Sequence, residues 1–531
     1  MKYLLQMAAC CSATQLVVAS PLTLQPACSS ASIVCHDLPD IEVLNIIADQ
    51  VNNFKFETSQ IGDIPAANWT NLNFCNVTVT YTHPSRNDTI NVNTWLPLED
   101  QWNGRFQGTG GASYVAGLGP ESLAPAVAAG YAASSTDAGL IQEDASTWAL
   151  LRPGEVDRIK LEDFASVSLN DLSLIGKAVT ESYYGRPPSH SYWSGCSTGG
   201  RQGMMLAQRY PEAFDGVLAL APAINWPPFV VADYWPQLIM NQLKYYPRPC
   251  ELEYLTAAAI EACDELDGLR DGVVSRPDLC TFTAKHLIGT KNLCSGEENT
   301  VTAQAAAIAD AAWSGPTGPS GQHLWPPYHI DAPLTGLPGI SLAFTNCTGL
   351  NRSSCVPEPF PVSEEWITLF VEKDPKFDPT KMTNEEYAQI FHRSVAEYQH
   401  IIGTANPDLS AFKQAGGKIL SWHGLADQLI APSGTALYYD AVLGQDPAAA
   451  DFYRLFFAPN TWHCQAGSAP YPYDSLQVLV DWVENGVAPD TLTAVNRTVA
   501  GDRATRPLCL YPKVQTYVAG DGETPASFTC V

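Results

Sequence analysis

The sequence predicts an α/β fold with a mainly parallel sheet, and three observations lead to that prediction. Strand-like and helical stretches alternate over residues 103–221. The same alternation returns over residues 418–485. The run Gly216–Ala221 is continuously apolar, which is typical of a strand that is buried on both faces. Strands that alternate with helices build a parallel sheet covered by helices.

The predicted elements follow one another along the chain. Residues 103–112 predict a strand that runs into a glycine loop, and residues 130–136 predict a second strand. Apolar positions at helical spacing predict a helix over residues 164–184. The short aromatic stretch 189–193 predicts a strand, and residues 202–210 predict the helix that follows it.

The alternation is interrupted in the middle of the chain. Residues 226–394 contain many proline, glycine and aromatic residues and show no regular succession of strands and helices. They therefore predict a lid domain inserted between two parts of one catalytic domain, residues 20–225 and 395–531. Residues 1–19 predict a signal peptide, because Lys2 precedes an apolar stretch that ends in small residues.

The composition predicts a secreted, extracellular globular protein. A formal charge of −26 disfavours nucleic acid as a partner, because phosphate binding needs a basic face. No later apolar run reaches 18 residues, so no membrane span is predicted. Monomer and homodimer both remain open. Six sequons indicate glycosylation in the secretory route: Asn68, Asn76, Asn87, Asn346, Asn351 and Asn496.

A nucleophile motif lies between the strand and the helix around residue 197. Residues 195–199 read Gly-Cys-Ser-Thr-Gly, a G-x-S-x-G pattern. Such a strand-to-helix turn holds its central residue in a strained conformation, and glycines on both sides allow the close packing. The pattern predicts an α/β-hydrolase fold with Ser197 as the nucleophile.

The acid and the base are predicted from their order in the chain, since they follow the serine in this fold. Asp427 lies in a loop after the predicted strand 418–422, whereas Asp440 and Asp451 lie beyond the next helical stretch. An exposed loop aspartate without catalytic role is the alternative for Asp427. His463 is the one histidine after Asp427, which makes it the predicted base.

Two cysteines adjoin the predicted catalytic residues. Cys196 immediately precedes Ser197, and Cys464 immediately follows His463. A disulfide between them would join the nucleophile's loop to the base's loop and restrict the unfolded chain by roughly 4–5 kcal/mol. The alternative is a coincidence of two cysteine positions.

A glycine loop and an acidic loop predict two further sites. A backbone N–H from the glycine loop 108–111, with Gly110 and Gly111 as candidates, would join that of Thr198 in an oxyanion hole, although the glycine loop could also be an ordinary tight turn. Asp264, Asp267 and Asp271 supply oxygen ligands suited to Ca²⁺. A disulfide between Cys263 and Cys280 could hold that loop. The alternative is a solvated acidic turn, and the spacing is not that of an EF-hand.

Several motifs together resemble the tannase/feruloyl esterase family of secreted fungal and bacterial hydrolases. The resemblance rests on residues 195–202 (Gly-Cys-Ser-Thr-Gly-Gly-Arg-Gln), the Asp427 loop and His463-Cys464. The segments 102–106 (Trp-Asn-Gly-Arg-Phe) and 263–272 (Cys-Asp-x-x-Asp-Gly-x-x-Asp-Gly) also match, so the resemblance extends over nearly the whole mature chain.

The resemblance implies an α/β-hydrolase domain with a lid and hydrolysis of hydroxycinnamic or gallic acid esters. It also implies Ca²⁺ bound by the side chains of the three aspartates and the carbonyls of Leu269 and Val273. The implied disulfides are Cys28–Cys75, Cys196–Cys464, Cys263–Cys280, Cys347–Cys355 and Cys509–Cys530. The chain departs from the family at Val301, where members often carry cysteine, so the pairing of Cys35, Cys250 and Cys294 stays open.

The sequence therefore predicts a secreted serine carboxylesterase that acts on small phenolic esters or feruloylated polysaccharides, with structural Ca²⁺ and no organic cofactor. A tannase acting on galloyl esters is the second choice. A non-catalytic, ligand-binding glycoprotein on a hydrolase scaffold is the alternative from another class. A metallohydrolase is disfavoured, because no His-Glu-x-x-His spacing occurs and the acidic loop offers only oxygen ligands.

Overall fold

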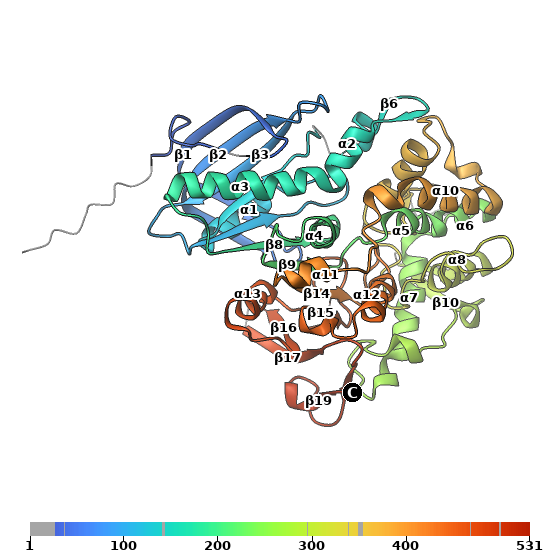
Figure 1. Cartoon of the computed structure of the whole chain (residues 1–531). Coiled ribbons are helices and arrows are strands. Elements are labelled where there is room, and N and C mark those ends of the chain that lie inside the picture. Colours follow the sequence, from blue (N-terminus) through green and yellow to red (C-terminus); the bar gives the residue numbers. More distant parts are fainter. Residues whose placement is uncertain are drawn as a thin grey trace, which may run out of the picture.

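The structure is a computed structural model that describes residues 27–531 except 37, 141–143, 295, 338, 349–353, 468 and 499–500. Figure 1 shows the whole chain. The predicted signal peptide, residues 1–19, and the sequon at Asn351 lie outside the described residues.

A nine-stranded sheet forms the centre of the fold, in the order β1-β2-β3-β5-β4-β8-β9-β14-β15. The strands β4, β5, β8, β9, β14 and β15 run parallel, while β1, β2 and β3 add an antiparallel end. The mainly parallel sheet confirms the predicted fold class. The strands are β1 Glu42–Thr58, β2 Ala67–Thr82, β3 Ile90–Pro97, β4 Arg105–Thr109, β5 Ala132–Thr136, β8 His190–Cys196, β9 Gly216–Leu220, β14 Lys418–Gly424 and β15 Tyr453–Ala458.

The side chains of the central strands alternate between two apolar cores, one on each face of the sheet. Along β8, Trp193 packs into the core that contains α3 (Ser168–Tyr184) and α4 (Thr198–Arg209). Its neighbour Tyr192 packs into the opposite core, with α1 (Pro120–Ala128) and α13 (Ser475–Asn485). This two-residue alternation fixes which face of the sheet each strand side chain meets.

The long antiparallel hairpin of β1 and β2 is not among the predicted strands as such. Before residue 101 the sequence predicts only short strand-like pieces, residues 77–81 and 89–95, which lie in β2 and β3. Most β1 side chains are exposed or half-buried, so the strand lacks the strong apolar alternation from which strands are predicted. Its partner β2 pairs with it along one edge, at 13 positions.

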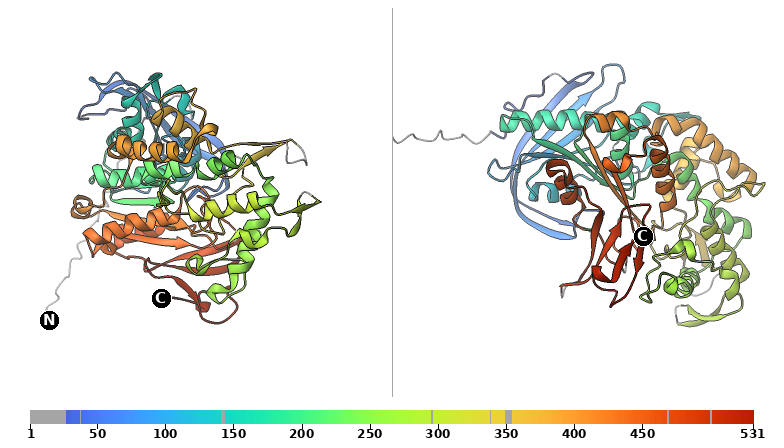
Figure 2. Two further views of the ribbon diagram at one scale, coloured as in Figure 1. Left: turned by 90° about the vertical axis from the view of Figure 1, so that its right-hand side faces the viewer. Right: turned by 60° about the horizontal axis from the view of Figure 1, so that its bottom comes forward.

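The chain between β9 and β14 adds helices and small hairpins beside the sheet, coloured green to orange in Figure 2. Its rings pack against the sheet domain: Tyr114 lies 5.8 Å from Trp226 and 5.9 Å from Phe370 between ring centroids. The helix α10 continues through residues 394 and 395, where the sequence places the end of the insertion. The elements are α5 Trp226–Ala232, α6 Trp235–Leu243, α7 Pro249–Cys263, β10 Lys291–Cys294, β11 Glu297–Thr300, α8 Ala303–Ser314, β12 Thr345–Cys347, β13 Cys355–Pro357, α9 Pro361–Glu365, α10 Asn384–Ile402 and α11 Ser410–Gln414.

The remaining elements lie around the sheet and at the C-terminus. In the described part of the chain, no helix combines the length and apolar character needed to cross a bilayer. These elements are β6 Leu150–Arg152, β7 Glu155–Val156, α2 Arg158–Glu162, α12 Pro432–Gln445, β16 Thr491–Thr498, β17 Gly501–Cys509, β18 Gln515–Tyr517 and β19 Phe528–Cys530.

Candidate active site

Ser197 occupies the sharp turn between β8 and α4. Its backbone has φ +62° and ψ −123°, a conformation that non-glycine residues rarely adopt. A Cβ placed on Gly195 would lie 2.7 Å from the Cα of Gly199, so this close approach requires glycine. The helix begins at Thr198, four residues before the predicted start at 202, and the turn therefore presents the serine hydroxyl at the carboxyl edge of the sheet.

The three predicted catalytic side chains come together from the ends of three strands. Ser197 follows β8, Asp427 follows β14 and His463 follows β15. The Nε2 atom of His463 lies 2.9 Å from the Ser197 Oγ, and its Nδ1 atom lies 2.8 Å from Asp427 Oδ2. These distances form a hydrogen-bonded chain from hydroxyl to imidazole to carboxylate.

Asp427 is fully buried and saturated with hydrogen-bond donors. Its Oδ1 accepts the backbone N–H groups of Leu429 and Ile430, both at 2.8 Å. Burial by itself would raise the pKa of the Asp427 carboxyl, but the charges and hydrogen bonds of His463 and His423 outweigh burial and lower this pKa well below its usual range. The carboxylate therefore stays ionised opposite the imidazole.

His423 is a second histidine on the same carboxylate, and the sequence prediction missed it. It lies at the end of β14 and is fully buried. Its Nε2 lies 3.0 Å from Asp427 Oδ2 and its Nδ1 lies 2.8 Å from the Thr435 hydroxyl. The hydroxyl can donate to Nδ1 while Nε2–H donates to the carboxylate. The sequence signal that could have identified His423 is its position four residues before the predicted acid.

We expect the His423→Ala substitution to lower kcat by about 10- to 100-fold with little change in KM. The carboxylate would lose a charge-assisted hydrogen bond worth about 1.5–3 kcal/mol, and the orientation of His463 would loosen. The acid limb of the pH profile of kcat/KM should move to higher pH, because loss of His423 removes a hydrogen bond and a charge that lower the pKa of Asp427. The His423→Gln variant, which keeps an N–H donor, should recover part of the rate. An unchanged pH profile with only a lowered Tm would leave His423 a purely structural role.

The disulfide predicted beside the catalytic residues is present. Cys196 and Cys464 form a disulfide with a Cα–Cα distance of 6.0 Å. The structure also pairs Cys250 with Cys294, a question that the sequence leaves open, and leaves Cys35 unpaired. The other four bridges are those that the resemblance implies: Cys28–Cys75, Cys263–Cys280, Cys347–Cys355 and Cys509–Cys530.

The N–H groups of Gly110 and Gly111, in the glycine loop beside the serine, already donate hydrogen bonds within the protein. The N–H of Gly110 donates to the carbonyl of Ser194, and that of Gly111 donates to Gln202 Oε1, both at 3.0 Å. Both donors are therefore engaged, Gly110 by a strand carbonyl and Gly111 by a buried side chain of α4. Among the described residues, the Thr198 N–H donates no hydrogen bond, so this donor remains available for an oxyanion.

A cavity of about 470 Å³ adjoins the triad. On one side of the cavity the wall is apolar, with one buried acid, Asp233, whose Oδ1 accepts the Tyr328 hydroxyl. Burial raises the pKa of Asp233 well above its ordinary value. A flat apolar group such as an aromatic ring matches this wall. The apolar residues are Trp226, Phe229, Ile340, Phe360, Val362, Leu429 and Ile430.

The predicted calcium ligands lie on one loop, between the bridged Cys263 and Cys280. Their carboxylates bond to the loop itself: Asp264 Oδ1 accepts the N–H of Gly272 at 2.9 Å, and Asp267 Oδ1 accepts that of Leu269 at 2.9 Å. Asp271 Oδ2 pairs with Arg506. The carbonyls of Leu269 and Val273 accept no hydrogen bond from the described residues.

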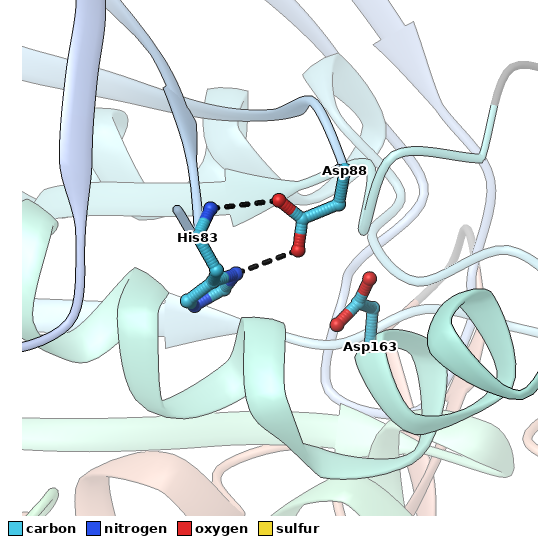
Figure 3. Close-up of side chains that lie close together, drawn as sticks. All are labelled: His83, Asp88 and Asp163. Atoms are coloured by element: carbon cyan, nitrogen blue, oxygen red, sulfur yellow. Dashed lines mark hydrogen bonds and ion pairs between the residues drawn. The ribbon is translucent and has the colours of Figure 1, made fainter. Parts of the chain in front are cut away.

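Another group of possible metal ligands lies away from the serine, and Figure 3 shows it. The backbone N–H and ring Nδ1 of His83 each lie 2.7 Å from an Asp88 carboxylate oxygen, and Asp163 points toward the pair. The guanidinium of Arg86 donates to Asp163 Oδ1 at 3.0 Å and lies 3.6 Å from Asp88. This guanidinium already pairs with both carboxylates, so the cluster is a buried ion-pair network.

Three of the described sequons expose their asparagine side chains, and two are half-buried. Asn68, Asn87 and Asn346 are exposed. Asn76 and Asn496 are half-buried, and Asn76 Oδ1 accepts a hydrogen bond from Asn93 at 2.9 Å.

Comparison with known proteins gives consistent matches over nearly the whole chain. The family model described as tannase and feruloyl esterase matches residues 75–531. A protein of Arthroderma benhamiae named probable feruloyl esterase is 42% identical over 509 residues, which cover 94% of this chain and 93% of that protein. The solved tannin acyl hydrolase from Aspergillus niger is 29% identical, with a TM-score of 0.84 and 94% coverage of each chain. Feruloyl esterase B from Aspergillus oryzae is 26% identical, with a TM-score of 0.77, covering 94% of this chain and 100% of that one.

Proposed function

The chain belongs to the tannase and feruloyl esterase family of carboxylic ester hydrolases, and on that premise we propose that it is a secreted serine esterase for hydroxycinnamic acid esters. The observation that carries the proposal is the continuous hydrogen-bonded chain Ser197–His463–Asp427 at a strained strand-to-helix turn. The feruloyl, p-coumaroyl and caffeoyl esters of plant cell walls, or chlorogenate, are the proposed substrates.

The proposed reaction proceeds in two steps through an acyl-enzyme. His463 Nε2 accepts the Ser197 proton as Oγ attacks the ester carbonyl, while Nδ1–H donates to Asp427. His463 then gives that proton to the oxygen of the leaving alcohol. A water molecule, deprotonated by the same imidazole, releases the aromatic acid and restores the serine.

The Thr198 N–H is the proposed first donor to the oxyanion, at the N-terminus of α4. The helix dipole adds to its effect on a negative oxygen. A second donor would come from the Gly110–Gly111 loop if a ligand oxygen replaced Gln202 Oε1 as the partner of Gly111. Loss of one oxyanion donor typically costs roughly 10²–10³ in rate.

Two observations support a hydroxycinnamate as the acid half of the ester. One is the apolar wall of the cavity, and the other is the 42% sequence identity with a probable feruloyl esterase. A propenoyl spacer and a methoxy group suit such a wall, whereas a galloyl ring brings three hydroxyls that need partners. Tannase activity is the second candidate, because the tannin acyl hydrolase from Aspergillus niger has the same fold at a TM-score of 0.84.

The test compares turnover of methyl ferulate, methyl p-coumarate, chlorogenate and methyl gallate by the purified protein. We expect kcat/KM for the methyl hydroxycinnamates to exceed that for methyl gallate by at least about tenfold, since unpaired hydroxyls penalise the wrong ring. The opposite order would make the protein a tannase. A protein that turns over none of these esters and does not react with a fluorophosphonate would instead be a binding protein.

Secretion and glycosylation are proposed on the signal-peptide pattern, the six disulfides and the exposed sequons. Disulfides persist in oxidising compartments outside the cytosol. Expression in a secreting fungal host should give a mature chain that begins near residue 20 and loses mass on treatment with an N-glycosidase.

Calcium binding at the acidic loop is a separate proposal. The loop offers carboxylates of Asp264, Asp267 and Asp271 together with the unpartnered carbonyls of Leu269 and Val273, a donor set of oxygens only. A bound ion would neutralise these carboxylates and crosslink the loop, which lies outside the reaction centre.

We expect a chelator to lower the Tm of the purified protein by several degrees, and elemental analysis to find one calcium per chain. At a free concentration of 100 Kd, a ligand stabilises the fold by about 2.7 kcal/mol. The Asp267→Asn variant should have a lower Tm that no longer responds to the chelator. An unchanged Tm together with a calcium-free protein would exclude the site.

A further inference from the structure

The carboxyl of Asp233 is a polar group in the otherwise apolar wall of the active-site cavity. Trp226, Phe229 and Asp233 all line that cavity. They occupy positions i, i+3 and i+7 along α5 and its C-terminal cap, so they lie on one face of the helix. The N–H of Ala223 donates to the Ser197 carbonyl at 3.0 Å, which places the start of this helix beside the nucleophile's turn. Asp233 lies roughly 10 Å farther along than Trp226, because an α-helix rises about 1.5 Å per residue.

One oxygen of this carboxyl is used by the fold. Oδ1 accepts the hydroxyl of Tyr328, and the same hydroxyl lies 3.1 Å from the carbonyl oxygen of Leu429. The backbone N–H of Leu429 in turn donates to the catalytic Asp427 at 2.8 Å. Asp233 is therefore connected, through Tyr328, to the loop that carries the acid of the triad, and these hydrogen bonds hold it in place relative to the reaction centre.

The other oxygen of Asp233 is buried and has no hydrogen-bond partner. The residue is 1% exposed, and its Oδ2 accepts no hydrogen bond from the described residues. Burial raises the pKa of this carboxyl well above its ordinary value, so it keeps its proton to higher pH than an exposed aspartate. Such a carboxyl still accepts a hydrogen bond. Because a buried acceptor without a donor is unfavourable, Oδ2 fits a ligand that brings a hydroxyl proton.

The surroundings of Oδ2 indicate which part of the ester brings that proton. Aromatic rings of a ligand pack well against aromatic side chains such as Trp226 and Phe229. An unsubstituted phenyl ring would leave Oδ2 unpaired, and a methyl ether would bring an oxygen without a proton. A phenol brings one hydroxyl donor on an otherwise apolar ring. The wall therefore matches the ring of a phenolic acid, with its free hydroxyl directed at Asp233.

We propose that Asp233 is a specificity-determining residue, which accepts the ring hydroxyl of the phenolic acid at Oδ2 and selects hydroxylated over unsubstituted aromatic acids. This inference rests on the proposed esterase function and adds to it the residue that recognises the ring. The phenol donates to Oδ2 while the hydrogen bond between Oδ1 and Tyr328 is kept. An acid without the hydroxyl leaves Oδ2 buried and unpaired in the complex, and this penalty separates the two classes of acid.

The experiment compares kcat/KM for three methyl esters that differ only in the para substituent of the ring: p-coumarate, cinnamate and 4-methoxycinnamate. We expect the wild type to prefer p-coumarate over each of the others by about tenfold, as for one hydrogen bond. In Asp233→Leu, which has no acceptor, this preference should disappear. Tyr328→Phe removes the hydrogen bond to Oδ1 but leaves Oδ2 in place, so it should keep the preference.

Asp331→Leu is the matched control. Asp331 is also a buried acid, 3% exposed, and neither of its carboxylate oxygens has a partner among the described residues. It is not among the described residues that line the cavity. The same substitution at this position should leave the preference for p-coumarate equal to that of the wild type, whatever its effect on the Tm.

Three results would overturn the role of Asp233. The first is equal kcat/KM of the wild type for p-coumarate and cinnamate, which decides alone if Asp233→Leu does not fold. The second is a preference that survives in a folded Asp233→Leu variant. The third is an equal loss of preference in Tyr328→Phe, which would assign selectivity to the hydrogen bond between the two residues.

Failure of the esterase proposal gives a different result, because the wild type would then cleave none of the three esters. A protein that prefers gallate is tested in the same way with methyl 4-hydroxybenzoate and methyl benzoate.

Discussion

The Ser197→Ala variant should fold like the wild type and lose roughly 10⁴- to 10⁶-fold in kcat on methyl ferulate. The substitution removes the Oγ that lies 2.9 Å from His463 Nε2, so no acyl-enzyme can form. Alanine keeps the backbone of the turn, since only the side-chain hydroxyl is removed. The residual rate would come from the Thr198 N–H and from substrate binding alone.

The measurement combines turnover with active-site labelling. Wild-type protein should bind one fluorophosphonate per chain, and the variant none, with the same Tm within a degree or two. Thr461→Ser is a suitable control, because Thr461 is buried near His463 but its hydroxyl bonds only to the Pro459 carbonyl. Full turnover by the Ser197→Ala variant would exclude Ser197 as the nucleophile.

The triad is predictable from sequence because a short motif and the order of residues along the chain suffice. The G-x-S-x-G pattern marks the turn, and a buried strand before Asp427 and another before His463 place both side chains at the same sheet edge. The Cys196–Cys464 bridge adjoins these residues in sequence, so it is also accessible to this reasoning.

Other parts of the site depend on contacts between distant segments, which a sequence pattern does not contain. Gln202 accepts the N–H of Gly111, although the two residues are 91 positions apart in the sequence. Asp63 accepts the hydroxyl of Ser194, 131 positions further along the chain. His423 was missed because the expected order places the base after the acid, and that rule excludes a supporting histidine before it. The β1 strand was missed because most of its side chains face solvent.

Removal of the Cys196–Cys464 bridge should affect both stability and catalysis. The bridge closes a loop of 268 residues, and its loss in a Cys196→Ala/Cys464→Ala variant should lower the free energy of unfolding by roughly 5 kcal/mol in the chain-entropy model. The same change removes the covalent link between the His463 loop and the Ser197 turn. Because a small displacement of a catalytic group can cost about 100-fold in rate, kcat should fall by about that factor.

The Cys509→Ala/Cys530→Ala variant separates the two effects. That bridge closes 21 residues near the C-terminus, so its loss should lower stability by about 3 kcal/mol without changing kcat. Urea unfolding gives the stabilities, and kcat is measured at a temperature where both variants are folded. A catalytic loss confined to the Cys196/Cys464 variant shows that the bridge holds the imidazole within reach of the hydroxyl. Equal kcat in the two variants would reduce the bridge to a stabilising crosslink.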